Sequence, residues 1–345
     1  MLLFYKESLL MQKTLLIPGG LGFIGCNFVR YMKEKYPEYR QVIVDNFSLI
    51  GTEHNLDGIP DIIVEKADIR DFVQMQEIYK HYKPDFVVNF AAESHNDRAI
   101  SSPNSFFETN TLGCQYLLEC SRIYGIEKHI HISTIEVYGE QGDVPYFTEE
   151  SPLNAKTPYS CAKAGGDMAV RAYMKTYDMP ICMTHCANNY GPYQYPEKLI
   201  PVMVTNLMLG KKVPIYGYGL QMRDWLHTID HSIAIDLVLH KGKSNEIYDI
   251  SARQEVTNME IARLVLKYMG LGEDRIEYVA DRPNHDRRYL IEPGKIEREL
   301  GFKPSVELEE GIRQTVEWYQ NNESWWRPIL EQNKNLQFDW STFQK

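Results

Sequence analysis

The sequence lacks any apolar run long enough to cross a membrane. A membrane-spanning helix takes about 20 consecutive apolar residues, whereas the apolar stretch at the start of the chain, Met1–Gln12, is interrupted by Lys6 and Glu7. We therefore expect a soluble protein with no membrane partner.

Positive charge is also in short supply. The chain has 37 Lys and Arg residues against 47 Asp and Glu residues, which gives a net charge of −10. Proteins that bind nucleic acids neutralise the phosphate backbone with a broad basic surface, and this composition does not provide one. We expect no nucleic-acid partner, and we expect an acidic substrate to bind in a local basic pocket.

Cysteine is present but shows no pattern of pairing. The six cysteines form no C-x-x-C motif, and no secretory leader is recognisable before them. Such motifs and leaders are the usual signs of a disulfide framework, a metal site or export. We therefore expect reduced thiols, a cytoplasmic location and no metal site. Internal repeats and low-complexity linkers are absent too.

The chain is long and apolar enough to bury a large core, with 345 residues of which 43% are hydrophobic. In its first half, short β-branched runs alternate with longer amphipathic stretches such as Asn104–Tyr124 and Tyr159–Tyr177, a pattern typical of βαβ units. The candidate strands are Thr14–Ile17, Gln41–Val44, Ile62–Glu65, Phe86–Phe90, His129–Ser133 and Pro180–His185. The sequence thus predicts an α/β fold with a Rossmann-type doubly wound parallel sheet.

The alternation ends after Asn188, where proline and glycine punctuate segments such as Tyr190–Pro196 and Pro214–Gly219. This change predicts a smaller C-terminal α/β lobe that binds substrate. We place the Rossmann domain, with the catalytic residues, at residues 13–187, and the lobe mainly at residues 188–330, with the chain crossing between the two. Doubly wound sheets bind ligands at the carboxyl ends of their strands.

A glycine-rich turn follows the first predicted strand and spaces Gly19, Gly22 and Gly25 at three-residue intervals. Glycine lets the backbone turn tightly and approach a pyrophosphate, which then lies against the free N–H groups of a helix N-terminus. Asp45 follows the second strand, where dinucleotide folds have the acidic residue that accepts the ribose hydroxyls. The alternative is that Asp45 is only a turn residue. A carboxylate there, with no arginine directly after it, favours NAD over NADP. Asp68 follows the third strand and either holds the adenine or caps a helix.

A second motif, Tyr159-x-x-x-Lys163, follows Pro158 at a predicted helix start. Residues four apart share a helix face, and a cationic lysine beside a phenol favours the phenolate. Such a tyrosine can take the proton of a sugar hydroxyl, and Thr134, just after the fifth strand, supplies a hydroxyl partner. The alternative is an ordinary surface pair.

Together these motifs, with Asn89-Phe90-Ala91-Ala92 and Ser133-Thr134-x-Glu136-Val137-Tyr138-Gly139, resemble an extended short-chain dehydrogenase/reductase. Further segments narrow the resemblance to the nucleotide-sugar 4,6-dehydratases, in particular those of dTDP-glucose. They are Ala92-Glu93-Ser94-His95-x-Asp97-Arg98, Asn188-Asn189-Tyr190-Gly191-Pro192-Tyr193-Gln194, Pro196-Glu197-Lys198-Leu199-Ile200-Pro201, Arg223-Asp224-Trp225 and His285-Asp286-Arg287-Arg288-Tyr289. The resemblance runs from about residue 13 to about residue 328.

The resemblance implies an internal redox cycle on a dTDP- or UDP-hexose. The sugar is oxidised at C4, a glutamate removes the C5 proton, an adjacent aspartate protonates the departing C6 hydroxyl, and the reduced cofactor returns hydride to C6. By position, Glu136 is the C5 base, the alternative being a solvated loop residue, but Ile135 stands where the family has its aspartate. An aliphatic side chain cannot give a proton, so His95, Asp97 or a water has to replace it.

The missing acid leaves other outcomes open. They are a 5,6-dehydratase that releases a 5,6-ene sugar, an epimerase at C4 or C5, and an inactive relative. A non-catalytic NAD-binding regulator is a further alternative, against which the retained Tyr159 and Lys163 argue.

The resemblance also implies binding residues. For NAD they are Gly19, Gly22, Phe23, Ile24, Gly25, Asp45, Asn46, Asp68, Ile69, Ala91, Ala92, Tyr159 and Lys163. For the nucleotide sugar they are Ser94, His95, Asn188, Asn189, Tyr193, Glu197, Lys198, Leu199, Arg223, Asn258 and Arg288. Of these, Lys198, Arg223 and Arg288 are expected around the diphosphate, and a surface ion pair is the alternative for each arginine. Thymine and uracil are not distinguished. A homodimer joined through the helices near 104–124 and 159–177 is expected.

Overall fold

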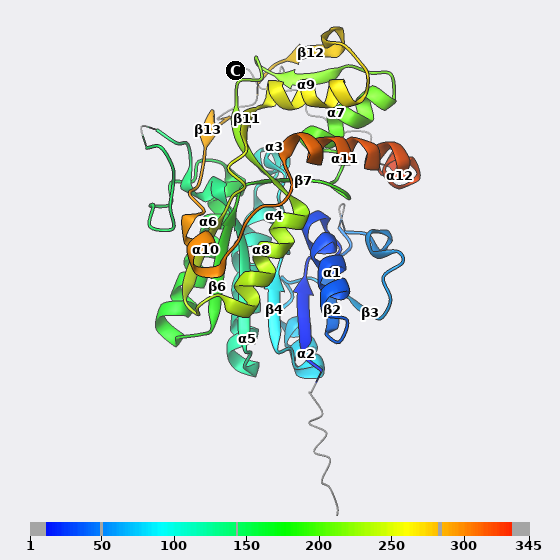
Figure 1. The fold of residues 1–345 in the computed structure, drawn as a ribbon. Helices are drawn as coiled ribbons and strands as arrows, with labels where there is room; N and C mark the ends of the chain where they lie inside the picture. The colour runs from blue at the N-terminus through cyan, green and yellow to red at the C-terminus, as the bar shows by residue number, and fades with distance from the viewer. Residues whose placement is uncertain (1–11, 49–50, 143, 282–284, 333–345) are drawn as a thin grey trace, which may run out of the picture.

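A seven-stranded parallel sheet organises the larger part of the molecule (Figure 1). The structure is a computed structural model that describes residues 12–48, 51–142, 144–281 and 285–332. The strand order is β10-β6-β5-β4-β1-β2-β3, so the winding reverses between β1 and β4 as in a doubly wound sheet. The strands are β1 (Thr14–Pro18), β2 (Arg40–Asp45), β3 (Ile62–Lys66), β4 (Phe86–Asn89), β5 (Lys128–Thr134), β6 (Ile181–Cys186) and β10 (Glu246–Ile250). The predicted fold class and all six candidate strands are confirmed.

Helices cover both faces of this sheet. On one face, α1 (Phe23–Lys35) packs against α8 (Thr228–Lys241). On the other face, α2 (Phe72–Tyr82) packs against α5 (Cys114–Tyr124), and α5 packs against α6 (Pro158–Tyr177). The large part of the molecule also has shorter helical elements, which are η1 (Glu53–Leu56), α3 (Asn96–Ser101), α4 (Asn104–Phe107), the π-helical η2 (Glu108–Gly113) and η3 (Ile135–Tyr138).

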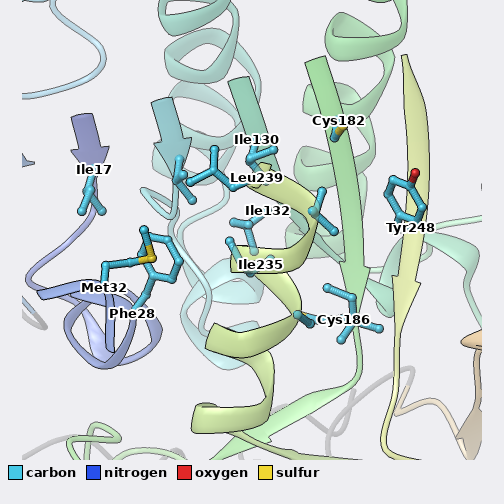
Figure 2. Packing of buried hydrophobic residues seen from close by; sticks show 14 of the residues in the cluster. Ile17, Phe28, Met32, Ile130, Ile132, Cys182, Cys186, Ile235, Leu239 and Tyr248 are labelled. Atoms are coloured by element: carbon cyan, nitrogen blue, oxygen red, sulfur yellow. The ribbon is translucent and has the colours of Figure 1, made fainter. Parts of the chain in front are cut away.

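Strand alternation divides the core between the two faces. Side chains that are neighbours along a strand point to opposite faces, so Ile17 packs under α1 and α8 while Leu16 packs toward α2 and α5. Figure 2 shows the first of these cores, in which Phe28 and Met32 of α1 and Ile235 and Leu239 of α8 face the sheet. All of these residues are buried.

A smaller lobe lies at the end of the sheet toward which β1 points (Figure 1). It contains a four-stranded sheet, the strand pair β8/β12, and four helices packed around a separate core. Its elements are β7 (Asn188–Tyr190), α7 (Leu199–Met208), β8 (Val213–Tyr216), β9 (Met222–His227), β11 (Glu255–Thr257), α9 (Asn258–Tyr268), η4 (Glu273–Arg275), β12 (Ile276–Val279), β13 (Arg288–Tyr289), α11 (Leu308–Asn321) and α12 (Glu323–Gln332).

The chain crosses between the two parts more than once. Helix α8, strand β10 and helix α10 (Gly294–Leu300) follow residue 188 yet pack with the large sheet, β10 as its edge strand beside β6. The division at residues 187 and 188 stays a prediction. Across the described residues, every helix is too short or too polar to span a membrane.

Candidate functional site

The turn between β1 and α1 requires its glycines. Gly19 has a φ of +75°, and a Cβ added to it would lie 2.4 Å from the backbone nitrogen of Ala91. A Cβ on Gly25 would lie 2.3 Å from the carbonyl oxygen of Gly19. Gly22 is the N-cap of α1 and offers no side chain to the helix. The first-turn amides of α1 have no partners within the helix, so this turn has the form of a phosphate cradle.

Acidic residues follow the next two strands. The Asp45 carboxylate is 9% exposed and accepts hydrogen bonds from the amides of Phe47 (3.0 Å) and Leu21 (3.3 Å). It therefore serves the local turn and also faces the site, and burial raises its pKa. The Asp68 carboxylate accepts hydrogen bonds from Asn46 and Arg70. Burial opposes its charge, but the bonds from Arg70 and Asn46 lower the pKa of Asp68 to about 2.

Helix α6 presents Tyr159 and Lys163 on one face. It begins at Pro158 with a capping box formed by Thr157 and Ser160. Tyr159 and Lys163 are both buried, and the Lys163 ammonium donates a hydrogen bond to the carbonyl oxygen of Ile132 at 2.7 Å. Burial and, to a smaller extent, the charge of Glu136 raise the pKa of Tyr159 well above 10. A hydrogen bond with Thr134 lowers this pKa. The effect of Lys163 on the phenol of Tyr159 stays a prediction.

The segment after β5 carries the remaining catalytic candidates. Thr134 is the N-cap of η3 and accepts a hydrogen bond from the amide of Glu136 at 3.3 Å. The Glu136 carboxylate accepts one from the side-chain amide of Asn96 at 2.9 Å. Ile135 is 2% exposed and packs in a cluster with Phe147, Tyr289 and other apolar residues.

One cavity joins these groups. Every residue predicted to bind NAD or to take part in catalysis lines it. Four of the predicted substrate residues also line it, namely Ser94, Asn188, Asn189 and Lys198. The Lys198 ammonium donates a hydrogen bond to the carbonyl oxygen of Ser94 at 2.6 Å. The cavity thus runs from the glycine turn to the Glu136 carboxylate.

The other predicted substrate residues do not line this cavity. Arg223 is buried, stacks on Tyr289 at 4.1 Å and donates hydrogen bonds to backbone carbonyls. Arg288 forms a two-point ion pair with Glu255, at 2.6 and 3.0 Å. Asn258 begins α9 and is buried, with no hydrogen-bond partner for its side-chain oxygen.

Three predicted substrate residues lie near the start of α7, and Tyr193 lies in an aromatic cluster. The His95 imidazole and the Glu197 carboxylate are buried, 3.8 Å apart. Leu199 begins α7 and packs on the core of the lobe. The Tyr193 ring packs on Trp318 at 4.8 Å and under the Arg30 guanidinium at 4.7 Å. Their substrate roles, like those of the arginines and Asn258, stay predictions.

Sequence reasoning missed several residues that line the cavity. They are Val44, Ser48, Gly51, Ala67, Phe90, Glu93, Thr109, Ile132, Ser133, Cys186, Ala187, Gln194 and Tyr195. Four of them, Ala67, Phe90, Cys186 and Ala187, end a strand of the large sheet or directly follow one. Counting each predicted strand end together with the two residues after it would have found these four, because ligands bind at that edge.

A doubly wound sheet with a glycine turn, a Tyr-x-x-x-Lys helix and one cavity between them defines an extended short-chain dehydrogenase/reductase. The family model described as GDP-mannose 4,6 dehydratase matches residues 16–315. The chain therefore belongs to the GDP-mannose 4,6 dehydratase family.

Relatives agree with this assignment. A dTDP-glucose 4,6-dehydratase of Salmonella typhimurium is 43% identical, over 90% of this chain and 94% of the relative. The crystal structure of a dTDP-glucose 4,6-dehydratase from Streptomyces venezuelae with NAD bound is 43% identical, with a TM-score of 0.88 over 92% of this chain and 99% of that one. A UDP-glucose 4-epimerase of Thermotoga maritima shares the fold at 29% identity, with a TM-score of 0.85 over 90% and 99% of the two chains.

Proposed function

We propose that this protein is an NAD-dependent nucleotide-sugar 4,6-dehydratase, a carbon–oxygen lyase that acts on a dTDP- or UDP-hexose through a 4-keto intermediate. The observation that carries the proposal is the single cavity that contains the glycine turn, Asp45, Tyr159 and Glu136. A dinucleotide site, a hydroxyl-deprotonating tyrosine and a carboxylate base are the groups that the reaction needs. The relatives named as dTDP-glucose 4,6-dehydratases favour a dTDP-hexose.

The residues present fit NAD. The cradle at Gly19, Gly22 and Gly25 would hold the pyrophosphate, and the Asp45 carboxylate would accept the ribose hydroxyls. The same carboxylate would repel a 2′-phosphate. Bound NAD would supply the hydride acceptor for oxidation at C4 and the hydride donor for reduction at C6.

The chain's own side chains provide the proton transfers. Tyr159 would take the proton of the C4 hydroxyl, with Thr134 as its hydrogen-bond partner and Lys163 as the nearby cation. Glu136 would remove the C5 proton, which an adjacent C4 ketone acidifies. The Asn96 amide holds one carboxylate oxygen of Glu136 in place, 2.9 Å away.

The departing C6 hydroxyl needs a proton, and the aliphatic side chain of Ile135 cannot donate one. His95 and Asp97, the two residues considered as replacements, are buried and do not line the cavity. Of the three candidates, this leaves water. General acid catalysis contributes about 10²–10⁴-fold, so we propose that elimination is the slow chemical step in this enzyme.

The alternative functions are less well supported. A 5,6-dehydratase or an epimerase would use the same first half-reaction, but the relatives at about 40% identity are named as 4,6-dehydratases and the epimerase is more distant. A non-catalytic regulator would have no need of Tyr159, Lys163 and Glu136 in one cavity.

The test is nuclear magnetic resonance of the products after incubation with dTDP-glucose, UDP-glucose or UDP-GlcNAc. We expect a 4-keto-6-deoxy sugar from at least one of them, with the natural protein and not with Glu136→Gln. A 5,6-ene sugar or a C4 or C5 epimer as the main product would contradict the proposal and support the corresponding alternative.

We further propose a cytoplasmic homodimer. Helices α4, η2 and α6 pack together and leave Phe107, Leu112 and Met168 between 44% and 58% exposed, and burial of such side chains favours association. The six cysteines are free thiols, as expected in a reducing compartment. Light scattering after size exclusion should give twice the chain mass, and Met168→Glu should give the monomer. Fractionation of cells tests the location.

A further inference from the structure

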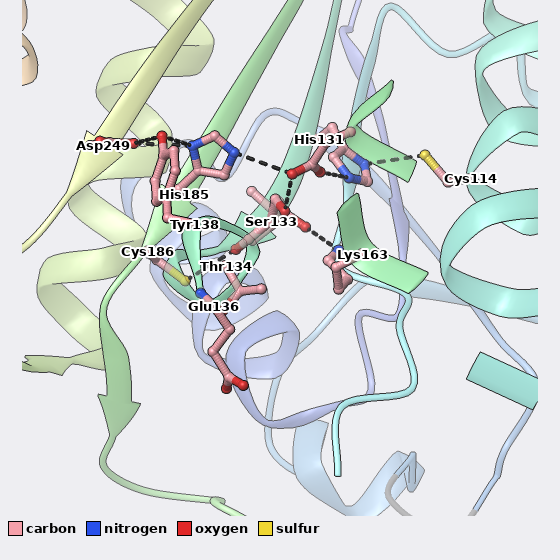
Figure 3. Close-up of polar contacts among 12 residues, drawn as sticks. Cys114, His131, Ser133, Thr134, Glu136, Tyr138, Lys163, His185, Cys186 and Asp249 are labelled. Carbon is pink, nitrogen blue, oxygen red and sulfur yellow. Dashed lines mark hydrogen bonds and ion pairs between the residues drawn. The ribbon is translucent and has the colours of Figure 1, made fainter. Parts of the chain in front are cut away.

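A buried polar network lies behind the catalytic residues (Figure 3). At its centre, the Asp167 carboxylate accepts a hydrogen bond from the Ser133 hydroxyl at 2.9 Å and lies 3.2 Å from Nε2 of His185. Nδ1 of His185 lies 3.0 Å from the Asp249 carboxylate, which also accepts a hydrogen bond from the Tyr138 hydroxyl at 3.1 Å. All five residues are buried, and none of them lines the cavity except Ser133.

Two residues of the network, Ser133 and Tyr138, lie on either side of the catalytic segment in the sequence. Ser133 directly precedes Thr134, and Tyr138 comes two residues after Glu136. Both ends of the segment are therefore tied to one set of buried charges, through Asp167 at the first end and through His185 and Asp249 at the second. The network joins four separate elements to η3, namely β5, β6, β10 and α6.

The network places buried carboxylates close to buried basic side chains. Both ring nitrogens of His185 face carboxylate oxygens, so both can donate only when the imidazole is protonated. Lys163 lies one helical turn before Asp167, on the same face of α6. The Asp167 and Asp249 carboxylates thus both contact His185, and Asp167 also lies one turn from Lys163. Buried charges are stable only when they are paired in this way.

The other groups near these cations come from neighbouring elements. Burial lowers the pKa of Lys163, and the charge of Asp167 opposes that effect. The thiols of Cys114 and Cys186 also act to raise this pKa. Burial also opposes the charge of His185, but its bonds to Asp167 and Asp249 raise its pKa to about 9. Burial lowers the pKa of His131, on β5, to about 4, so His131 is neutral. The Glu149 carboxylate also borders the network, since it accepts a hydrogen bond from the Asp249 amide.

We propose that Asp167 is a positioning residue for the reaction: with His185 and Asp249, it fixes the segment that carries Thr134 and Glu136, and it supplies the buried counter-charge that keeps Lys163 cationic. This inference rests on the proposed function for its catalytic consequence. The charge state of His185 does not depend on that function.

The first experiment compares three variants by steady-state kinetics on the nucleotide sugar that the natural protein converts. Asp167→Asn keeps the shape and removes the charge, and kcat should fall by about 10²-fold, as when a distant change misplaces reacting groups, while KM changes little. The basic limb of the pH profile should move to lower pH, because Lys163 without its counter-charge loses its proton more easily. Asp167→Glu restores the charge and should recover part of kcat.

The matched control is Asp230→Asn, a change at an equally buried carboxylate on α8 that binds Ser305 and Val306 instead. It should lower stability and leave the pH profile in place. The proposal is overturned if Asp167→Asn has the profile of the natural protein, or if Asp230→Asn moves the profile equally.

The second experiment measures the natural protein, so its result does not depend on whether the Asp167 variants fold. Side-chain nitrogen resonances of the histidines, with His185 identified by its absence from His185→Gln, should show both ring nitrogens of His185 protonated at pH 7 and up to about pH 9. A neutral His185 at pH 7 overturns the proposed network. If the nucleotide sugars are not converted but His185 is charged, the proposed function fails and the network stands.

Discussion

Ile135→Asp places a carboxyl group where the cavity has only an apolar side chain. Ile135 lines the cavity beside Glu136 and Tyr159, so an introduced acid would border the reacting sugar. In the natural protein, C5 proton exchange should outpace loss of the C6 hydroxyl, because Glu136 is present and a side-chain acid at Ile135 is not. The variant should speed elimination by up to about 10²–10⁴-fold, the range of general acid catalysis.

The same change has a cost in stability. Ile135 is 2% exposed in an apolar cluster. Shortening a buried isoleucine costs about 2–5 kcal/mol, and burying a polar group without a partner adds about 1–3 kcal/mol. Since the side chain borders the cavity, water can reach the new carboxyl group. We therefore expect the loss of stability to lie near the lower end of both ranges. Burial also raises the pKa of the introduced carboxyl, which keeps it protonated and able to donate.

The assay follows deuterium entry at C5 and 6-deoxy product in heavy water, with Ile135→Asn as the matched control. Asparagine has nearly the same size and polarity as aspartate but no acidic proton, so both variants should lose similar stability and only Ile135→Asp should gain elimination rate. Equal elimination rates in two folded variants would refute the reasoning. A full dehydratase rate in the natural protein, without excess C5 exchange, would show that another group supplies the proton.

Three further predictions concern other parts of the site. Because the Asp45 carboxylate disfavours a 2′-phosphate, denatured protein should release NAD; recovery of mainly NADP would overturn that assignment. Tyr159→Phe should abolish NADH absorbance on mixing with the sugar nucleotide while binding by calorimetry persists, and unchanged absorbance would remove Tyr159 from the mechanism. His185 has a folded-state pKa of about 9, above its ordinary value near 6.5, so its stabilisation is complete below about pH 6.5 and is lost as pH rises through 9. Denaturant unfolding should show this decline in the natural protein and a smaller one in His185→Gln.

The first half of the fold was predictable because all of its strands except the edge strand β3 are almost entirely buried. Such strands read as short apolar runs between helices, and all six appear within two residues of their predicted ends. Strand β10 was not predicted. Its sequence, Glu246–Ile250, has two acidic residues among five and so does not read as an apolar run, and its partner β6 lies far earlier in the chain.

The site was predictable where one local motif fixes the geometry. The glycine turn and the Tyr159/Lys163 helix each lie within a few residues, and every residue they contain that was assigned to NAD lines the cavity. The partners of Arg223 and Arg288 depend on how β9, β11 and β13 pair, which local sequence does not specify. The Asp167 network was beyond sequence reasoning for the same reason, since its members come from five elements.

The central claim is that one cavity oxidises C4 and returns the same hydride to C6. Incubation of the natural protein with dTDP-glucose that carries deuterium at C4 tests this claim most directly. The account predicts a 4-keto-6-deoxy product whose C6 methyl group contains the deuterium, because the same bound NAD would serve as hydride acceptor and hydride donor. A product with an unlabelled methyl group, or recovery of the deuterium at C4 of an unchanged or epimerised sugar, would contradict it.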